Sequence, residues 1–139
     1  MTMARRGLLT CLVLAVAMAV AGCSKDQEVN ATLAEIDSFT AELLKRADTG
    51  DPSAGVNEAQ RYFDEHKAGL KPRLAALMKV RGFEITEETK KKITECAARN
   101  ASAVMSLRIK HTARIMQDPT LGTRLEKLSQ DFNALLTTP

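Results

Sequence analysis

The histidines and cysteines of this chain are the residues whose chemistry could support catalysis or metal binding. No nucleophile-elbow sequence or other catalytic signature surrounds any Ser or Cys. Di-iron bundles place a Glu three residues before each ligating His, whereas here Phe63 precedes His66 and Arg108 precedes His111. A Cys-x-x-Cys-His site for covalent haem does not occur either. We therefore expect no enzyme activity, no catalytic residues and no metal site.

A haem or metal held jointly by bundle side chains is the alternative from a different class of function. The expected turn between the second and third helices centres near residue 83, so His66 lies 17 residues before it and His111 lies 28 residues after it. That mismatch corresponds to about 16 Å along a helical hairpin, which is too far for joint ligation. Met105 is nearer to the level of His66, about 8 Å away along the axis. We expect no cofactor.

The start of the chain has the layout of an export signal. Arg5 and Arg6 precede an uncharged, strongly apolar segment, residues 8–20, which is too short for a comfortable membrane span. An aliphatic residue, two small residues and a cysteine follow, as Val20-Ala21-Gly22-Cys23. This stretch resembles the lipobox of bacterial lipoprotein precursors, a resemblance that covers only the leader. It implies diacylglyceryl attachment at Cys23, cleavage before that residue, and acylation of the new N-terminus. An ordinary secretory signal with an incidental Cys, or an uncleaved anchor, is the alternative.

The resemblance also carries an expectation about location. Several acyl chains, at about 0.8 kcal/mol per buried CH₂, make a stable membrane anchor. In enteric-type bacteria an Asp after the lipidated Cys favours retention at the inner membrane, and here the next residue is Ser24. We therefore expect a lipid-anchored protein of the bacterial cell envelope, at the outer membrane and facing the periplasm. Its first partner is the membrane itself.

Composition favours one folded domain. The chain has 139 residues, 45% of them hydrophobic, with 20 Lys+Arg and 17 Asp+Glu. It is too apolar to be disordered, and a net charge of +3 is too small to indicate nucleic acid. The charges are nevertheless uneven, with 5 basic and 10 acidic residues over 23–70 against 13 and 7 over 71–139. Two interpretations stay open: acidic helices packing beside basic ones, or a functional basic surface.

Apolar residues at steps of three and four predict four helices, over residues 30–48, 53–80, 87–117 and 119–137. Ser53 and Thr86 are candidate N-caps, Pro119 a candidate helix start, and Gly82 a candidate stop. Pro72 predicts a kink in the second helix. Short connections indicate antiparallel neighbours, and therefore an all-α, up-down four-helix bundle. The domain organisation expected is a signal peptide over 1–22, a short polar tether over 23–28, and the bundle over 29–139.

Cys96 is the one thiol that remains after lipidation and removal of the leader. It lies on the apolar stripe of the third helix, which indicates a small buried core residue. The alternative is a disulfide-linked dimer, which an oxidising envelope would permit. Asn100 lies on the same stripe, either as a buried residue that sets helix register or as a partly exposed one.

Helix lengths place a distinctive tip at one end of the bundle. The second and third helices should extend beyond both outer helices over roughly residues 72–98, at the end where the tether emerges. A basic tip with apolar residues suits contact with anionic head groups. The alternative is that the kink folds the tip back, so that Phe83 and Leu77 cap the core. The candidate membrane or partner surface comprises Lys71, Arg73, Lys79, Arg81, Phe83, Lys90, Lys91 and Lys92.

These observations indicate a non-enzymatic, lipid-anchored helical module that binds a protein or an envelope surface. Its protein partner is unknown. In size and class the domain is similar to secretin pilotins, which are small helical lipoproteins that grip an amphipathic helix of a partner. No pilotin motif occurs here, so a pilotin-like chaperone is an alternative by architecture alone.

Overall fold

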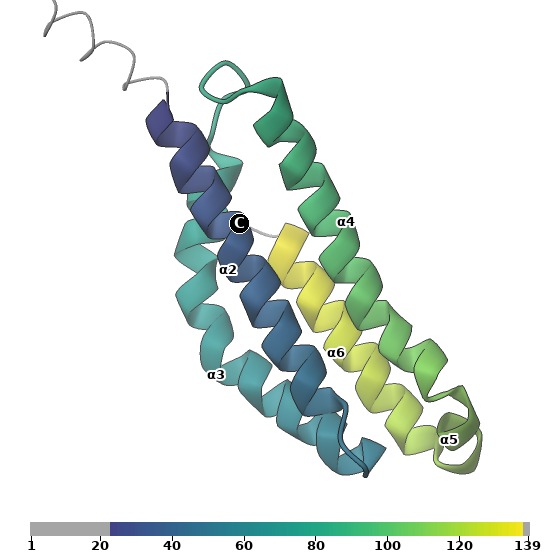
Figure 1. Cartoon of the computed structure of the whole chain (residues 1–139). Helices are drawn as coiled ribbons and strands as arrows, with labels where there is room; N and C mark the ends of the chain where they lie inside the picture. The colour runs from purple at the N-terminus through teal and green to yellow at the C-terminus, as the bar shows by residue number, and fades with distance from the viewer. Residues whose placement is uncertain (1–22, 138–139) are drawn as a thin grey trace, which may run out of the picture.

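The chain forms an all-α helical bundle in a computed structural model that describes residues 23–137. The expected signal peptide, residues 1–22, lies outside the described residues, as do residues 138–139. Figure 1 shows the long helices packed side by side, with a short helix crossing one end. The elements are α2 (Cys23–Ala47), α3 (Pro52–Met78), α4 (Glu87–Lys110), α5 (Thr112–Gln117) and α6 (Pro119–Thr137).

Local side-chain chemistry explains where α3 and α4 begin. Thr86 caps α4 as expected, because its hydroxyl accepts the N–H of Thr89 at 3.3 Å. The expectation that Ser53 caps α3 is wrong. Asp51 is the cap, since its carboxylate accepts the N–H of Ser53 at 2.9 Å and Pro52 occupies the first helical position, where a missing N–H has no cost.

Helix α2 begins earlier than the apolar stripe indicates. Residues 24–28, expected as an extended tether, belong to its first turns. Asp26 gives a reason for the extension, because its Oδ1 accepts the backbone N–H of Thr86 at 3.0 Å. A hydrogen bond to the start of α4 therefore holds this polar turn in the bundle although it buries little apolar surface.

The expected single helix over 87–117 is divided at His111. The His111 side chain is buried, and its backbone N–H still bonds the Leu107 carbonyl at 3.1 Å before the chain turns into α5. The turn brings Ile115 over α6, where a Cβ added at Gly122 would lie 2.8 Å from Ile115 Cγ2. Close packing of α5 on α6 is the physical reason for the break. Helix α3 likewise ends at Met78, before Gly82, so that glycine lies in the loop.

Helix α3 is continuous through Pro72. The proline ring cannot donate to the carbonyl of Ala68 and crowds it, which favours bending at this turn. Figure 1 shows α3 changing direction along its length, so that it wraps around the bundle instead of following one straight axis.

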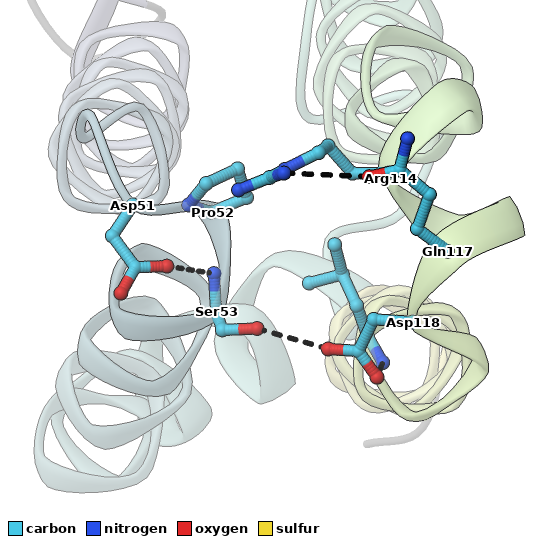
Figure 2. A pocket seen from close by; sticks show the side chains of 7 residues that line it. Asp51, Pro52, Ser53, Arg114, Gln117 and Asp118 are labelled. Carbon is cyan, nitrogen blue, oxygen red and sulfur yellow. Dashed lines mark hydrogen bonds between the residues drawn. The ribbon is translucent and has the colours of Figure 1, made fainter.

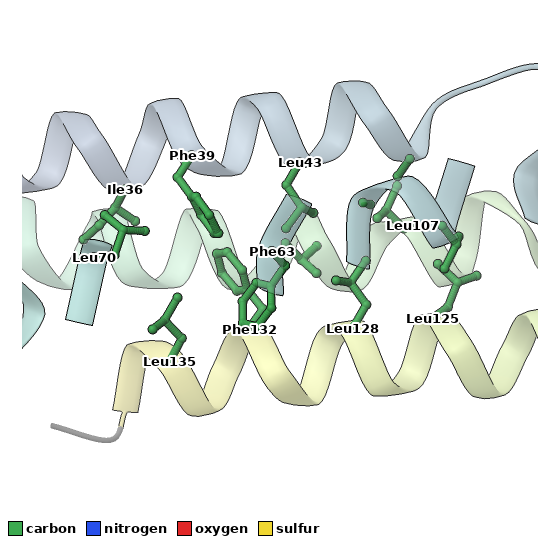
Figure 3. Close-up of a cluster of buried hydrophobic side chains, with 14 of the residues drawn as sticks. Ile36, Phe39, Leu43, Phe63, Leu70, Leu107, Leu125, Leu128, Phe132 and Leu135 are labelled. Carbon is green, nitrogen blue, oxygen red and sulfur yellow. The ribbon is translucent and has the colours of Figure 1, made fainter. Parts of the chain in front are cut away.

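The core follows the predicted stripes closely. Phe39 is the main addition, since it is buried on α2 beside the expected Ile36 and Leu43. It stacks on Tyr62 with a centroid distance of 5.3 Å and lies 5.9 Å from Phe63. Figure 3 shows Phe39 and Phe63 beside Phe132 of α6, in a row with Leu128 and Leu135 of the same helix. The largest fully buried side chains are Phe63, Phe132, Leu43, Leu121, Leu128, Val56 and Cys96.

The helices alternate in direction along the chain, but their neighbours are not those of the simplest hairpin order. Helices α2 and α6 each pack mainly against both α3 and α4, so the α3–α4 connection crosses a diagonal of the bundle. As a result, acidic α2 runs parallel to basic α4. The ion pairs Asp37–Arg99, at 2.8 Å, and Asp48–Lys110, at 2.7 Å, join them. This agrees with the interpretation that acidic helices pack beside basic ones.

Candidate functional site

The loop over residues 79–86, which we call the tip, lies at the same end of the bundle as the start of α2. The hydrogen bond from the Thr86 N–H to Asp26 fixes this relation, and Figure 1 shows the first turn of α2 beside the loop. Cys23, the residue expected to carry the lipid, is the first residue of α2. The expected anchor and the expected surface therefore share one end of the molecule.

The tip packs back on the bundle only in part. Leu77, Val80 and Ile85 are half-buried and contact the core, as folding back predicts for Leu77. The expectation that Phe83 caps the core is wrong, because this residue is 80% exposed. Among the residues of the tip, Phe83 is the one large apolar side chain that is exposed, whereas Val80 and Ile85 pack against the core.

The expected overhang is also different from the prediction. Because α2 begins at Cys23, it reaches the level of the tip, and only α6 stops short of it, as Figure 1 shows. Three helices therefore surround the axis near the tip, where four do further down. The sequence pattern missed this because residues 24–28 are all polar, so that the apolar stripe begins only at Val29.

The basic residues of the predicted surface divide into paired and unpaired groups. Four of them have carboxylate partners: Arg73 with Glu35, Lys90 with Glu87, Lys91 with Glu95 at 3.6 Å, and Lys92 with Glu88 at 2.7 Å. The remaining cations, Lys71, Lys79 and Arg81, are exposed and make no ion pair with a carboxylate of the described chain. These three cations are the part of the predicted surface whose charge no carboxylate of residues 23–137 neutralises, and the exposed Phe83 adds an apolar ring to it.

An apolar cavity of about 160 Å³ lies below the tip, where the end of α6 meets the other three long helices. Its walls come from one turn of α3, one turn of α4, two residues of α2 and the end of α6. A helical stripe in the sequence shows which face is buried and not where a neighbouring helix ends, so the pattern does not reveal this cavity. The lining residues are Leu33, Ile36, Leu74, Leu77, Met78, Ile93, Cys96, Ala97 and Leu136.

Cys96 and Asn100 belong to a polar junction between α2 and α4. Cys96 is 2% exposed, which confirms the buried reading, and Asn100 is 4% exposed. The amide of Asn100 donates to Asp37 Oδ1 at 2.7 Å, and Arg99 donates to both carboxylate oxygens of Asp37 at 2.9 and 2.8 Å. Burial, with the nearby charge of Asp37, raises the pKa of the Cys96 thiol to about 11, so the thiol stays protonated. Of the two positions considered for Asn100, the structure shows the buried one, with a hydrogen bond from α4 to α2.

A second concavity, of about 170 Å³, lies at the opposite end of the bundle, between the start of α3 and the end of α5. Figure 2 shows that its carboxylates are already engaged. Asp51 caps α3, while Asp118 accepts the Ser53 hydroxyl at 3.2 Å and the Thr120 N–H at 3.0 Å. These contacts hold the ends of the helices together.

The two histidines have different surroundings. His66 is exposed on α3 and stacks on Tyr62, with ring centroids 4.2 Å apart. His111 is buried at the α4–α5 break. Met105, the other side chain considered for haem, is exposed on α4. Over residues 23–137 no three His, Cys, Asp or Glu side chains are grouped as metal ligands would be.

None of the helices in the described part of the chain has both the length and the apolar character needed to cross a bilayer. No protein-family model matches this sequence, and comparisons with curated proteins and with solved structures find no significant similarity.

Proposed function

We propose that this protein is a non-enzymatic, lipid-anchored helical module of the bacterial cell envelope that docks on a membrane or protein surface through its tip. The lipobox-like sequence ending at Cys23 supports an outer-membrane lipoprotein facing the periplasm. The tip geometry supports docking. Phe83 is exposed at the end where Cys23 begins α2, and Lys71, Lys79 and Arg81 lie nearby without carboxylate partners.

The exposed position of Phe83 is the observation that carries this proposal. An aromatic ring at a bilayer interface gains apolar burial, worth about 1.5–3 kcal/mol when complete. Each Lys or Arg near an anionic surface adds about 1 kcal/mol, which salt screens. A lipid at Cys23 would keep the tip beside the membrane, so weak contacts of this kind are sufficient to orient the bundle.

Anchoring is tested by the intact mass of the protein purified from bacterial membranes. The mature chain is expected to begin at Cys23 and to carry diacylglyceryl and acyl mass on that residue. A Cys23→Ser chain is expected to keep its leader and to lack that mass. A mature chain that begins elsewhere, or has no acyl mass, would refute the lipoprotein assignment.

Docking is tested separately, with a non-lipidated chain that begins at residue 24 and retains every core residue. Sedimentation with anionic liposomes at low salt is expected to decrease strongly for Phe83→Ser and for Lys79→Glu with Arg81→Glu. Met116→Ser is the matched control, because Met116 is 81% exposed at the opposite end of the bundle. If wild type fails to sediment, or if Phe83→Ser behaves like Met116→Ser, the tip does not dock on membranes.

A further inference from the structure

The apolar cavity below the tip has the dimensions of a binding site for part of a hydrocarbon chain. It is lined by Leu74 and Met78 of α3 and by Ile93 and Ala97 of α4, which is about one turn, or roughly 6 Å, on each helix. Leu136 closes it at the end of α6. A volume of 160 Å³ is close to that of apolar protein cavities that take up a six-carbon guest.

The same dimensions argue against a partner helix as the occupant. An amphipathic helix docks through residues spread over several turns, at positions i, i+4 and i+7. Here Val80 and Ile85 of the tip pack against the core above the cavity, and the end of α6 bounds it below. One exposed turn between these limits accommodates a flexible chain and is too short for a helix.

The rim of the cavity supplies charge. Lys71 lies on the same face of α3 as Leu74 and Met78, at the i, i+3 and i+7 positions, and it is exposed without an ion-pair partner among the described residues. Residues 66–83 contain five Lys or Arg and no Asp or Glu. A carboxylate or phosphate at the rim would therefore meet positive charge that no local carboxylate neutralises.

From the cavity and its rim, we propose that this site binds the hydrocarbon tail of an anionic single-chain lipid, such as a fatty acid, with its head group beside Lys71. Cys96 forms part of the wall as a neutral thiol and takes no part in chemistry. The proposal does not depend on lipidation of Cys23, because the cavity is built entirely from the bundle.

The test measures binding to the non-lipidated chain that begins at residue 24 by calorimetry, with dodecanoate below its micelle concentration and with butanoate. Saturable binding of one dodecanoate per chain is expected. Each methylene that enters the cavity raises the affinity about fourfold, and butanoate leaves at least two methylene positions of a six-carbon cavity empty, so dodecanoate should bind at least tenfold more tightly than butanoate. Absence of saturable binding, or an affinity independent of chain length, would overturn the proposal.

Site-directed variants locate the bound chain. Ala97→Phe fills the cavity from an exposed position and is expected to lower dodecanoate affinity at least tenfold. Ala98→Phe is the matched control, since Ala98 is exposed and does not line the cavity. Circular dichroism confirms folding of each variant. If Ala97→Phe is unfolded, Lys71→Glu is tested in its place. This substitution is expected to lower the affinity for dodecanoate about fivefold and to change the affinity for dodecanol little. Equal binding by Ala97→Phe and Ala98→Phe would overturn the proposal.

Two further measurements separate other occupants. If dodecanoate does not bind but Ala97→Phe abolishes a dimer seen by sedimentation, the cavity is a contact between copies and the proposal is wrong. Where dodecanoate does bind the non-lipidated chain, the lipidated protein is titrated in parallel. Unchanged binding supports a site for a free anionic lipid, and blocked binding overturns the proposal, because the acyl chain of the protein's own anchor then occupies the cavity.

Discussion

Asp37 is the residue through which α2 and α4 are held in register. It receives hydrogen bonds from Asn100 and Arg99, and the Cys96 thiol also points to it, at 3.6 Å. Desolvation alone would raise the pKa of Asp37, but these hydrogen bonds and the charge of Arg99 outweigh it, so the pKa lies below its ordinary value of 3.8. The charged form is therefore favoured by folding.

This predicts that the contribution of Asp37 to the free energy of unfolding decreases at acid pH. Because the folded-state pKa is depressed, the stabilisation is complete above pH 3.8 and is lost as pH falls through the folded-state value. The difference in unfolding free energy between wild type and Asp37→Asn should therefore be largest near pH 5–7 and should narrow below pH 3.8. Urea unfolding at pH 7, 5, 3.5 and 2.5 measures it. A difference that stays constant over this range would contradict the assignment.

Cys96 is expected to be unreactive toward thiol reagents in the native state. With a pKa of about 11 its thiolate is scarce at pH 8, and its side chain is buried. Reaction with a thiol reagent should be at least about 100-fold slower in the folded chain beginning at residue 24 than in the same chain unfolded in urea. The double variant Cys96→Ala with Ala98→Cys, which moves the thiol to an exposed position, should react rapidly while folded. Equally fast reaction of native wild type would show that this junction opens readily.

At the scale of the elements, the glycines show where helices approach one another closely. A Cβ added at Gly55 would lie 2.5 Å from the carbonyl oxygen of Ala47, because the start of α3 abuts the end of α2. Gly69 lies inside α3 with nothing within 4 Å of an added Cβ. Close packing therefore requires glycine at position 55, whereas Gly69 only lowers the stability of α3.

Opposite outcomes are therefore expected for the same substitution. Gly69→Ala should stabilise the protein by about 0.5–1 kcal/mol, since alanine loses less backbone entropy in a helix. Gly55→Ala should destabilise it by about 1–3 kcal/mol, since backbone must shift to admit the methyl group. Thermal and urea unfolding of the two variants beside wild type measure both values. Stabilisation by Gly55→Ala would mean that the α2–α3 turn is looser than the structure shows, and destabilisation by Gly69→Ala would mean that this part of α3 has no room for a methyl group.

At the scale of the whole molecule, packing is uneven from end to end. Phe39, Phe63 and Phe132 meet where four helices surround the core, as Figure 3 shows. Toward the tip, α6 ends, a cavity of about 160 Å³ lies between its end and the other long helices, and Phe83 is exposed. The tip end therefore combines incomplete packing with the candidate functional features, and local opening concentrates in regions of this kind.

Native-state hydrogen exchange should reproduce this gradient. Amides of the tip and of the adjoining turns of α3 and α4 are expected to exchange through local opening, well before amides around Phe39 and Phe132. Mass spectrometry of peptic fragments resolves these segments. Bound dodecanoate should slow exchange in the tip-end turns more than in the aromatic region. Uniform protection from exchange along α3 and α4 would contradict the lower local stability expected at the tip end.

Sequence periodicity by itself determined the helical class and nearly all of the core. Residues at steps of three and four, such as Leu121, Leu125 and Leu128, must share one face of a helix, and that face must be buried. Local chemistry also placed the Thr86 cap and the Pro119 start, because capping depends on residues close in sequence. The lipobox-like leader is likewise a local pattern, and its role stays a prediction.

Only the tertiary structure decided which helices are neighbours. The eight residues between Met78 and Glu87 can extend over about 26 Å, enough to reach an adjacent or a diagonal position, so loop length did not discriminate between the two. The parallel pairing of α2 with α4, the break at His111, the exposure of Phe83 and the apolar cavity all follow from that arrangement. An amphipathic stripe specifies that a face is buried, but the partner that buries it is chosen by contacts between residues distant in sequence.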